Sequence, residues 1–195
     1  MKIFTTINLD YLTNVYFVTD NEQKYGVIID PGSFSMNVYK LVQSTGAVIK
    51  KIIITHNDIE QTGGIALIKK IYNAEIYAYD QNIQDFKAKK VRSGTVIKEG
   101  ELHFIIFETP VHSYDSISIL IEDSLFIGEI FQAGTLCSFR ENEDPSHYEY
   151  DIIKKNILSL KDHVVIYPGK GPSTTVEIER KFNPYFRKIL NEKNR

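Results

Sequence analysis

The stretch Thr55-His56-Asn57-Asp58-Ile59-Glu60-Gln61-Thr62-Gly63-Gly64 follows directly on the apolar run Ile52-Ile53-Ile54. The apolar run predicts a buried strand, and the glycine pair precedes a helix that we expect to continue through Ile71. Imidazole, carboxylate and amide side chains therefore gather where a buried strand ends. Such strand ends are where binding groups are usually mounted, so this stretch is the first candidate for a functional site.

Four more segments of the same kind occur along the chain, each at the end of a predicted strand. They are Ile29-Asp30-Pro31-Gly32, Thr109-Pro110-Val111-His112, Gly128-Glu129-Ile130-Phe131 and Tyr167-Pro168-Gly169-Lys170-Gly171-Pro172. Their position at strand ends predicts that their polar side chains meet in one cleft.

The segments between these sites alternate between strand and helix patterns. Period-two or β-branched runs predict strands at residues 2–7, 14–19, 25–30, 75–79, 102–108, 116–121, 125–128 and 164–167. One helix is predicted at residues 34–45 and ends near Gly46. Further helices are predicted directly after the capping box of Ser146 and Glu149 and at residues 183–190. Hairpins combined with amphipathic helices favour sheets covered by helices over a wholly parallel sheet.

Length and composition indicate one soluble globular domain that spans residues 1–195. Hydrophobic residues make up 43% and charged residues 25%, and the formal net charge is -2. The basic residues are dispersed, so we expect no nucleic-acid partner and no membrane partner. The single cysteine, Cys137, is interpreted as a core residue. The absence of a signal-like start or a long apolar run predicts a cytoplasmic location.

The five segments, in this order and at these spacings, resemble the metallo-β-lactamase superfamily, and specifically the small glyoxalase II-like (hydroxyacylglutathione hydrolase-like) hydrolases. Residues Thr174-Thr175, Glu179-Arg180 and Asn183-Pro184-Tyr185 are similar to the C-terminal pattern of the same group. The resemblance covers nearly the whole chain. It implies an α/β fold, a four-layer αββα sandwich, with the site along one edge of its two sheets.

The metal-binding pattern of those hydrolases is only partly present in this chain. Their first motif reads His-x-His-x-Asp-His, and a later histidine, a bridging aspartate and a final histidine complete the ligand set. The seven corresponding residues here are His56, Asp58, Glu60, Gln61, His112, Glu129 and Lys170. Only His56 and His112 match, so the resemblance implies a degenerate metal site.

The altered residues limit which metals the site can hold. His56, Asp58 and His112 can still supply three ligands to one zinc or other divalent ion, with Glu129 at the bridging position. Gln61 is a weak neutral ligand and Lys170 is a cation, so a second metal is not expected. The alternative is a site with no metal at all. In either case we expect the ammonium of Lys170 to lie among Asp58, Glu60 and Glu129 and to balance their charge.

Three functions stay open at this point. The first is a one-metal hydrolase of thioesters or related acyl substrates, in which Glu60 or Glu129 orients the attacking water. The second is a catalytically inactive, metal-free pseudoenzyme that serves as a binding or scaffold protein. The third is metal-free acid–base chemistry by a glutamate paired with Lys170. A small-molecule substrate is compatible with the cleft, and the oligomeric state is open.

Residues outside the motifs receive simpler interpretations. His103, His147 and His163 are expected at the surface or beside helix caps. Tyr114 either narrows the mouth of the cleft or simply packs, and Arg140 is expected to pair with backbone or carboxylate groups.

Overall fold

The computed structural model describes residues 1–136 and 146–187. The first sheet has six strands in the order β1 (Lys2–Asn8), β2 (Thr13–Thr19), β3 (Tyr25–Ile29), β4 (Val48–Ile53), β5 (Glu75–Ala78) and β8 (Lys89–Lys90). β1, β2 and β3 pair antiparallel, whereas β3, β4, β5 and β8 run parallel. The parallel part matters for the site, because the carboxyl ends of β3 and β4 lie at one edge of the sheet.

The second sheet also has six strands and contains one parallel pair. Its order is β16 (Thr174–Thr175), β15 (Val165–Pro168), β12 (Ser124–Gly128), β11 (Ile117–Ile121), β10 (Leu102–Glu108) and β9 (Val96–Glu99). β12 and β15 are parallel, and the other neighbours pair antiparallel. Two short hairpins complete the described strands: β6 (Asn82–Ile83) with β7 (Phe86–Lys87), and β13 (Phe131–Gln132) with β14 (Thr135–Leu136).

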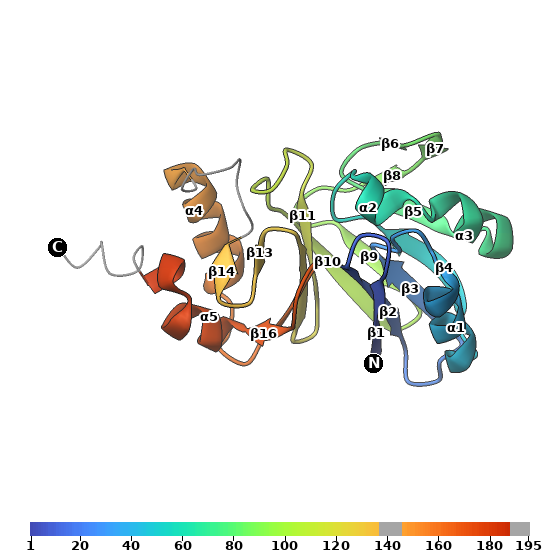
Figure 1. Cartoon of the computed structure of the whole chain (residues 1–195), viewed down its shortest axis with the longest axis horizontal. Coiled ribbons are helices and arrows are strands. Elements are labelled where there is room, and N and C mark those ends of the chain that lie inside the picture. The colour runs from blue at the N-terminus through green and yellow to red at the C-terminus, as the bar shows by residue number, and fades with distance from the viewer. Residues whose placement is uncertain (137–145, 188–195) are drawn as a thin grey trace.

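Helices cover the outer face of each sheet, as Figure 1 shows. The helices are α1 (Met36–Thr45), α2 (Ile59–Thr62), α3 (Ile65–Tyr72), α4 (His147–Ile153), the π-helix η1 (Lys154–Leu158) and α5 (Val176–Phe182). α1 and α3 lie against the first sheet, and α4, η1 and α5 lie against the second. This arrangement confirms the four-layer αββα sandwich.

Three apolar clusters fill the three interfaces between the four layers. In β2, Val15 and Phe17 pack toward the helices, whereas Tyr16 and Val18 pack toward the second sheet. Both faces of β2 are thus buried, as its unbroken apolar and small-polar sequence requires. The third cluster includes Ile153 and Ile157 of the helical layer over the second sheet.

Most predicted elements agree with the structure, but several elements of the structure were not predicted. The capping box is confirmed, since Ser146 accepts from the backbone of Glu149 and the Glu149 side chain accepts from the backbone of Ser146. The helix predicted at residues 183–190 is confirmed in its described part, because residues 184–187 are helical. The helix before it, α5 at Val176–Phe182 with Thr175 as its N-cap, was not predicted. β9 was not predicted, because its exposed, lysine-containing sequence lacks a strong apolar pattern.

The C-terminal pattern Thr174, Glu179 and Asn183 forms a buried network. The carboxylate of Glu179 accepts hydrogen bonds from Thr174 Oγ1 at 2.8 Å, from Asn183 Nδ2 at 2.7 Å and from the backbone of Gly134. A buried carboxylate needs such donors to offset its lost hydration. The pattern therefore stabilises the packing of α5 against the residues after β13.

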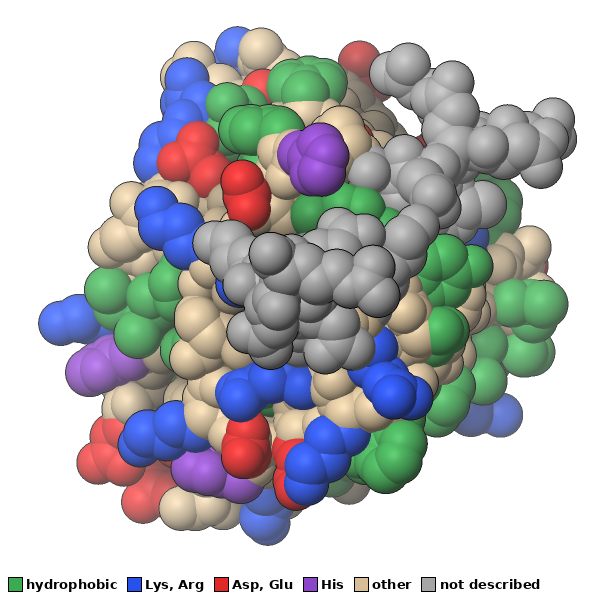
Figure 2. Space-filling model, turned by 90° about the vertical axis from the view of Figure 1, so that its left-hand side faces the viewer, with side chains coloured by type: hydrophobic (Ala, Val, Ile, Leu, Met, Phe, Trp, Pro, Cys, Tyr) green, Lys and Arg blue, Asp and Glu red, His purple; other side chains and the backbone are tan. Residues whose placement is uncertain are grey.

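Among the described residues, no helix is long and apolar enough to cross a bilayer. Figure 2 shows lysine and arginine side chains beside aspartate and glutamate side chains on one face of the molecule.

Candidate functional site

The polar segments that follow β3, β4, β12 and β15 meet at one edge of the sandwich. The backbone of Ile117 donates to Thr55 O at 2.9 Å, which joins the ends of the two sheets. Gly169 donates to Gly128 O at 2.6 Å, which places the lysine loop beside the glutamate loop. Gly128 has a φ of 56°, and a Cβ there would lie 2.6 Å from Thr55 Oγ1. A glycine is therefore needed where the two sheets approach each other.

Lys170 lies between two glutamates at this edge. Its Nζ is 2.7 Å from Glu60 Oε2 and 3.1 Å from Glu129 Oε2. The other oxygen of Glu129 accepts from Gln61 Nε2 at 2.7 Å. One ammonium, two carboxylates and one amide thus form a continuous network, which agrees with the ion pair predicted from the sequence.

The network is only partly shielded from water. The side chains of Lys170 and Glu60 are 29% and 30% exposed, whereas that of Glu129 is 9% exposed. Burial by itself would lower the pKa of Lys170, but the hydrogen bonds to Glu60 and Glu129 prevail and raise it above its ordinary 10.5. Lys170 is therefore charged at every pH at which the protein is expected to work.

His56 is buried at the same edge of the sandwich, and one of its ring nitrogens has no hydrogen-bond partner among the described residues. Its Nδ1 is 3.1 Å from Thr55 Oγ1, and no described residue makes a hydrogen bond to its Nε2. When Asp30 is ionised, Thr55 Oγ1 donates to Asp30, so the hydroxyl can only accept from His56 Nδ1. The lone pair of His56 then resides on Nε2, where a ligand can use it. Burial first, and then the nearby His112, lower the pKa of His56 from 6.5 to about 4.

Asp30 holds the backbone beneath His56. Its carboxylate accepts from the backbone of Thr55 at 2.8 Å and from Thr55 Oγ1 at 2.7 Å. Burial raises the pKa of Asp30 from 3.8 to about 7, although both hydrogen bonds from Thr55 act in the opposite direction. The sequence marked Asp30 only as part of a motif segment. Its role in orienting Thr55 and His56 follows from the structure.

Asp58 and His112 are more exposed than His56. The Asp58 side chain caps α2 by accepting from the backbone of Glu60 at 3.2 Å. The ring of His112 lies edge-on to that of His56, with centroids 4.7 Å apart and an interplanar angle of 73°. Asp115, which sequence reasoning did not assign to the site, accepts from the backbone of Asn57 at 2.7 Å and from Ser113 Oγ at 2.6 Å. It therefore fixes the loop of His112 against the loop of His56.

The predicted site residues thus fall into two neighbouring groups. Glu60, Glu129 and Lys170 are joined by ion pairs, and His56 and His112 are joined by ring contact. Asp58 lies next to both groups in the chain, but its described hydrogen bond is to the helix backbone. Their roles in binding or catalysis stay predictions.

The residues outside the motifs mostly behave as expected. His103, His147 and His163 are exposed, and His163 pairs with Asp123. Tyr114 is 70% exposed, donates to Asp80 Oδ2 at 2.5 Å and meets Tyr79 edge-on. The predictions for Cys137 and Arg140 lie outside the described residues.

The donor set does not fit a two-metal centre. Lys170 and Gln61 stand at two of the second-metal positions in the motif, and a lysine ammonium has no lone pair to offer. In residues 1–136 and 146–187, no group of three or more His, Cys, Asp or Glu side chains is placed to hold a metal ion. The partnerless Nε2 of His56 and the adjacent His112 are the imidazole ligands that the first-metal position retains.

The family assignment follows from comparison with known proteins. The metallo-beta-lactamase superfamily model matches residues 9–134, which is more than half of the chain. The chain therefore belongs to the metallo-β-lactamase superfamily, whose members commonly bind divalent metals such as zinc and iron.

Individual relatives are similar at low identity. The hydroxyacylglutathione hydrolase GloC of Haemophilus influenzae is 24% identical over 200 residues, which cover 89% of this chain and 91% of that protein. A hydroxyacylglutathione hydrolase of Thiobacillus denitrificans is 28% identical over 129 residues, or 65% of this chain, and the match spans half of that protein's length. The crystal structure of ETHE1 from Myxococcus xanthus superposes with a TM-score of 0.84 at 21% identity and covers 100% of this chain and 92% of that one. At this identity the structural likeness shows the fold alone.

Proposed function

We propose that this metallo-β-lactamase-fold chain is a pseudoenzyme, a binding or scaffold protein whose cleft works without a two-metal centre. The observation that carries the proposal is the position of Lys170, with its Nζ 2.7 Å from Glu60 and 3.1 Å from Glu129. In a two-metal hydrolase, the second cation neutralises carboxylates and stabilises the charge that develops on the reacting oxygens. A lysine ammonium performs the first task but cannot activate a water by coordination.

The electrostatics of the network support a role in binding. One positive and two negative side chains give the cluster a formal charge of -1, and Lys170 already has both glutamates as partners. Gln61 Oε1 and His56 Nε2 are buried without partners among the described residues. Buried polar atoms of this kind are normally satisfied by water or by a ligand. A small molecule that supplies hydrogen-bond donors fits these two atoms.

A one-metal hydrolase of thioesters or related acyl substrates is the second candidate. It is favoured by the lone pair on His56 Nε2 and by the adjacent ring of His112. In that case the ion is zinc or another divalent metal, Asp58 and Glu129 complete its ligands, and Glu60 orients the water. Acid–base chemistry by Lys170 with a glutamate is less favoured, because the pKa of Lys170 is raised away from neutrality.

Both candidates require that the site lack a two-metal centre, and metal content tests this requirement. We expect protein purified without added metal, and then titrated with zinc, to bind at most one ion per chain. Any ion should depend on His56 and His112, because imidazole is the strongest ligand that remains. The double variant His56→Ala/His112→Ala should lose it, whereas the control His103→Ala/His163→Ala should not, since both control histidines are exposed and outside the cleft. Two ions per chain, measured by elemental analysis, would contradict the proposal.

Hydrolysis of a hydroxyacylglutathione thioester gives an independent measurement. We expect turnover close to the uncatalysed rate, because the site lacks the charge stabilisation of a second metal, which is worth several kcal/mol in two-metal enzymes. Thioester cleavage is followed by the release of free thiol, with and without a chelator. Rapid hydrolysis that the chelator abolishes would reject the pseudoenzyme and support the one-metal hydrolase.

The cellular setting also belongs to the proposal. We place the protein in the cytoplasm, with a small-molecule ligand and with no nucleic-acid or membrane partner. The formal net charge of -2 supports this view of its partners.

A further inference from the structure

A second pocket, separate from the lysine–glutamate network, lies at the open edge of the sandwich. It occupies about 420 Å³ between β1 and the residues that precede β16, the two strands that form the edges of their sheets. Its volume lies within the roughly 300 to 1,000 Å³ of ordinary small-molecule sites. None of the residues His56, Glu60, Glu129 and Lys170 is among its nine described lining residues.

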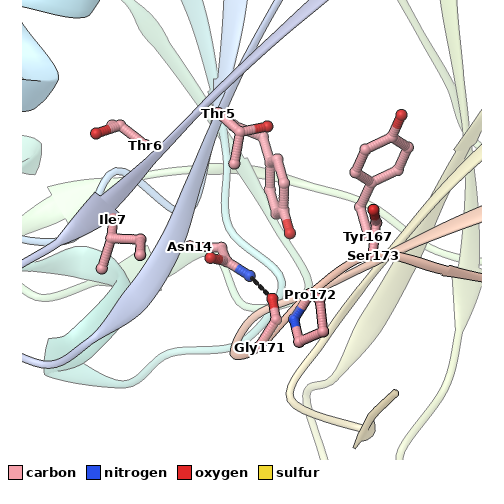
Figure 3. Close-up of a pocket in the computed structure, with 9 residues that line it drawn as sticks. Thr5, Thr6, Ile7, Asn14, Tyr167, Gly171, Pro172 and Ser173 are labelled. Atoms are coloured by element: carbon pink, nitrogen blue, oxygen red, sulfur yellow. Dashed lines mark hydrogen bonds between the residues drawn. The ribbon is translucent and has the colours of Figure 1, made fainter. Parts of the chain in front are cut away.

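The pocket is lined by hydroxyl groups that are free to bind a ligand. Thr5 and Ser173 face each other across it in Figure 3, with Tyr167 beside Ser173. No hydrogen bond between described residues engages the side-chain hydroxyls of Thr5, Ser173 and Tyr167. Thr5 and Ser173 are exposed, so their hydroxyls now face water. A ligand that carries its own hydroxyls can exchange hydrogen bonds with them at little cost.

Three rings give the pocket apolar surface in a fixed position. The ring of Tyr167 stacks on Phe126, with centroids 5.0 Å apart and an interplanar angle of 22°, and meets Tyr16 edge-on at 5.5 Å. Tyr16 and Pro172 supply the other two rings of the lining. Because Tyr167 is held by two neighbours, it needs no reordering when a ligand packs on it.

The floor of the pocket is tied to the loop that carries Lys170. Asn14 Nδ2 donates to Pro168 O at 2.9 Å and to Gly171 O at 2.7 Å, and Figure 3 shows the second of these bonds. Tyr16 OH also donates to Pro168 O, at 2.5 Å. These contacts bridge the two sheets and make the pocket a preformed cavity.

We propose that this pocket binds a neutral, hydroxyl-bearing ring compound of about monosaccharide size. None of the nine described lining residues is charged, so a charged ligand would lose hydration without gaining a counter-charge. The free hydroxyls match the polar rim of such a ring, and Tyr167 and Pro172 match its C–H faces. This inference is independent of the function proposed for the cleft, because it requires neither metal nor turnover.

Amide chemical shifts in NMR titrations test the proposal with defined probes. We expect methyl glucoside or methyl galactoside to give saturable shifts at Thr5, Gly171 and Ser173. Glucuronate, which keeps the ring but adds a carboxylate, should bind at least tenfold more weakly. No saturable shift with either neutral glycoside, or equal binding of glucuronate, would overturn the proposal.

Variants locate the binding on the protein. Thr5→Tyr and, independently, Ser173→Tyr should fill the pocket and weaken glycoside binding at least tenfold. Val96→Tyr is the matched control, because Val96 is also exposed on a sheet edge, in β9, but lies outside the pocket. Far-ultraviolet circular dichroism verifies that each variant folds. Glycoside binding that survives both pocket variants, or that is lost equally in the control, would show that the ligand binds elsewhere.

Discussion

Replacing Asp30 by asparagine is expected to make the free energy of unfolding fall as pH drops, and replacing His56 by asparagine is expected to make it fall as pH rises. Both side chains are buried, and burial shifts their pKa values in opposite senses. The pKa of Asp30 rises from 3.8 to about 7, and that of His56 falls from 6.5 to about 4. In each case the uncharged form is favoured in the folded protein.

The signs follow from which state binds more protons. Between about pH 4 and 7, folded Asp30 holds a proton that the unfolded chain has lost, so its contribution to stability falls as pH rises. Between about pH 6.5 and 4, the unfolded chain protonates its histidine while folded His56 stays neutral, so this contribution falls as pH drops. The two slopes oppose each other over about pH 4 to 6.5, and the parent should therefore show a nearly flat profile.

Each variant removes the pH dependence contributed by one side chain and leaves that contributed by the other. Asp30→Asn should lose stability on acidification from pH 6.5 to 4, and His56→Asn should lose it as pH rises from 4 to 7. Each change should be on the order of 3 kcal/mol, since one unit of pKa shift corresponds to about 1.4 kcal/mol. Urea unfolding followed by circular dichroism gives the free energy at each pH. His163→Asn is the control, because His163 is exposed. Profiles of the same slope in all four proteins would refute this account.

The fold could be predicted from the sequence because its layers are encoded by local patterns. The run before Thr55 is apolar at consecutive positions, and Ile52 and Ile53 indeed pack on opposite faces of β4. Glycines and polar turns then mark where each strand ends. The strand ends converge because parallel neighbours in both sheets present their carboxyl ends at one edge.

The ion pair of Lys170 with Glu60 and Glu129 could also be predicted, whereas the surroundings of His56 could not. Motif position and charge identify Lys170 and its partners, since opposite charges at one sheet edge attract. The roles of Asp30 and Asp115 depend on hydrogen bonds to backbone groups 25 and 58 residues away. No local pattern reports such contacts. The capping role of Asp58 has a visible signal, because an aspartate before a short helix is a common N-cap.

Lys170→Met is expected to destabilise the folded protein by about 1 to 3 kcal/mol near neutral pH. The methionine keeps the length of the side chain but leaves Glu60 and Glu129 facing each other without a cation. The uncompensated charge of Glu129 should account for most of the lost stability, because its side chain is only 9% exposed and Gln61 is then its one remaining partner among the described residues. The partial exposure of Glu60 and Lys170 limits the loss, since water screens their charges.

The pH range over which this loss is present follows from the pKa of Lys170. Lys170 has a pKa raised above 10.5, so its own contribution is fully present below that pH and is lost only when pH rises past its folded value. The loss in Lys170→Met should therefore be constant between pH 6 and 8.

Two further variants separate lost charge balance from lost packing. Adding Glu129→Gln to Lys170→Met should recover part of the stability, because it removes the less exposed of the two uncompensated carboxylates while keeping the shape of the side chain. Lys89→Met should have little effect, because Lys89 and its partner Glu75 are 58% and 46% exposed. If the Lys170→Met variant were as stable as the parent from pH 5 to 8, the ammonium would not be compensating the carboxylates. If instead the Glu129→Gln addition destabilised the variant further, the lysine would act through packing. The recovery expected in the double variant requires that Lys170 serve in the folded protein as the fixed cation of the cleft.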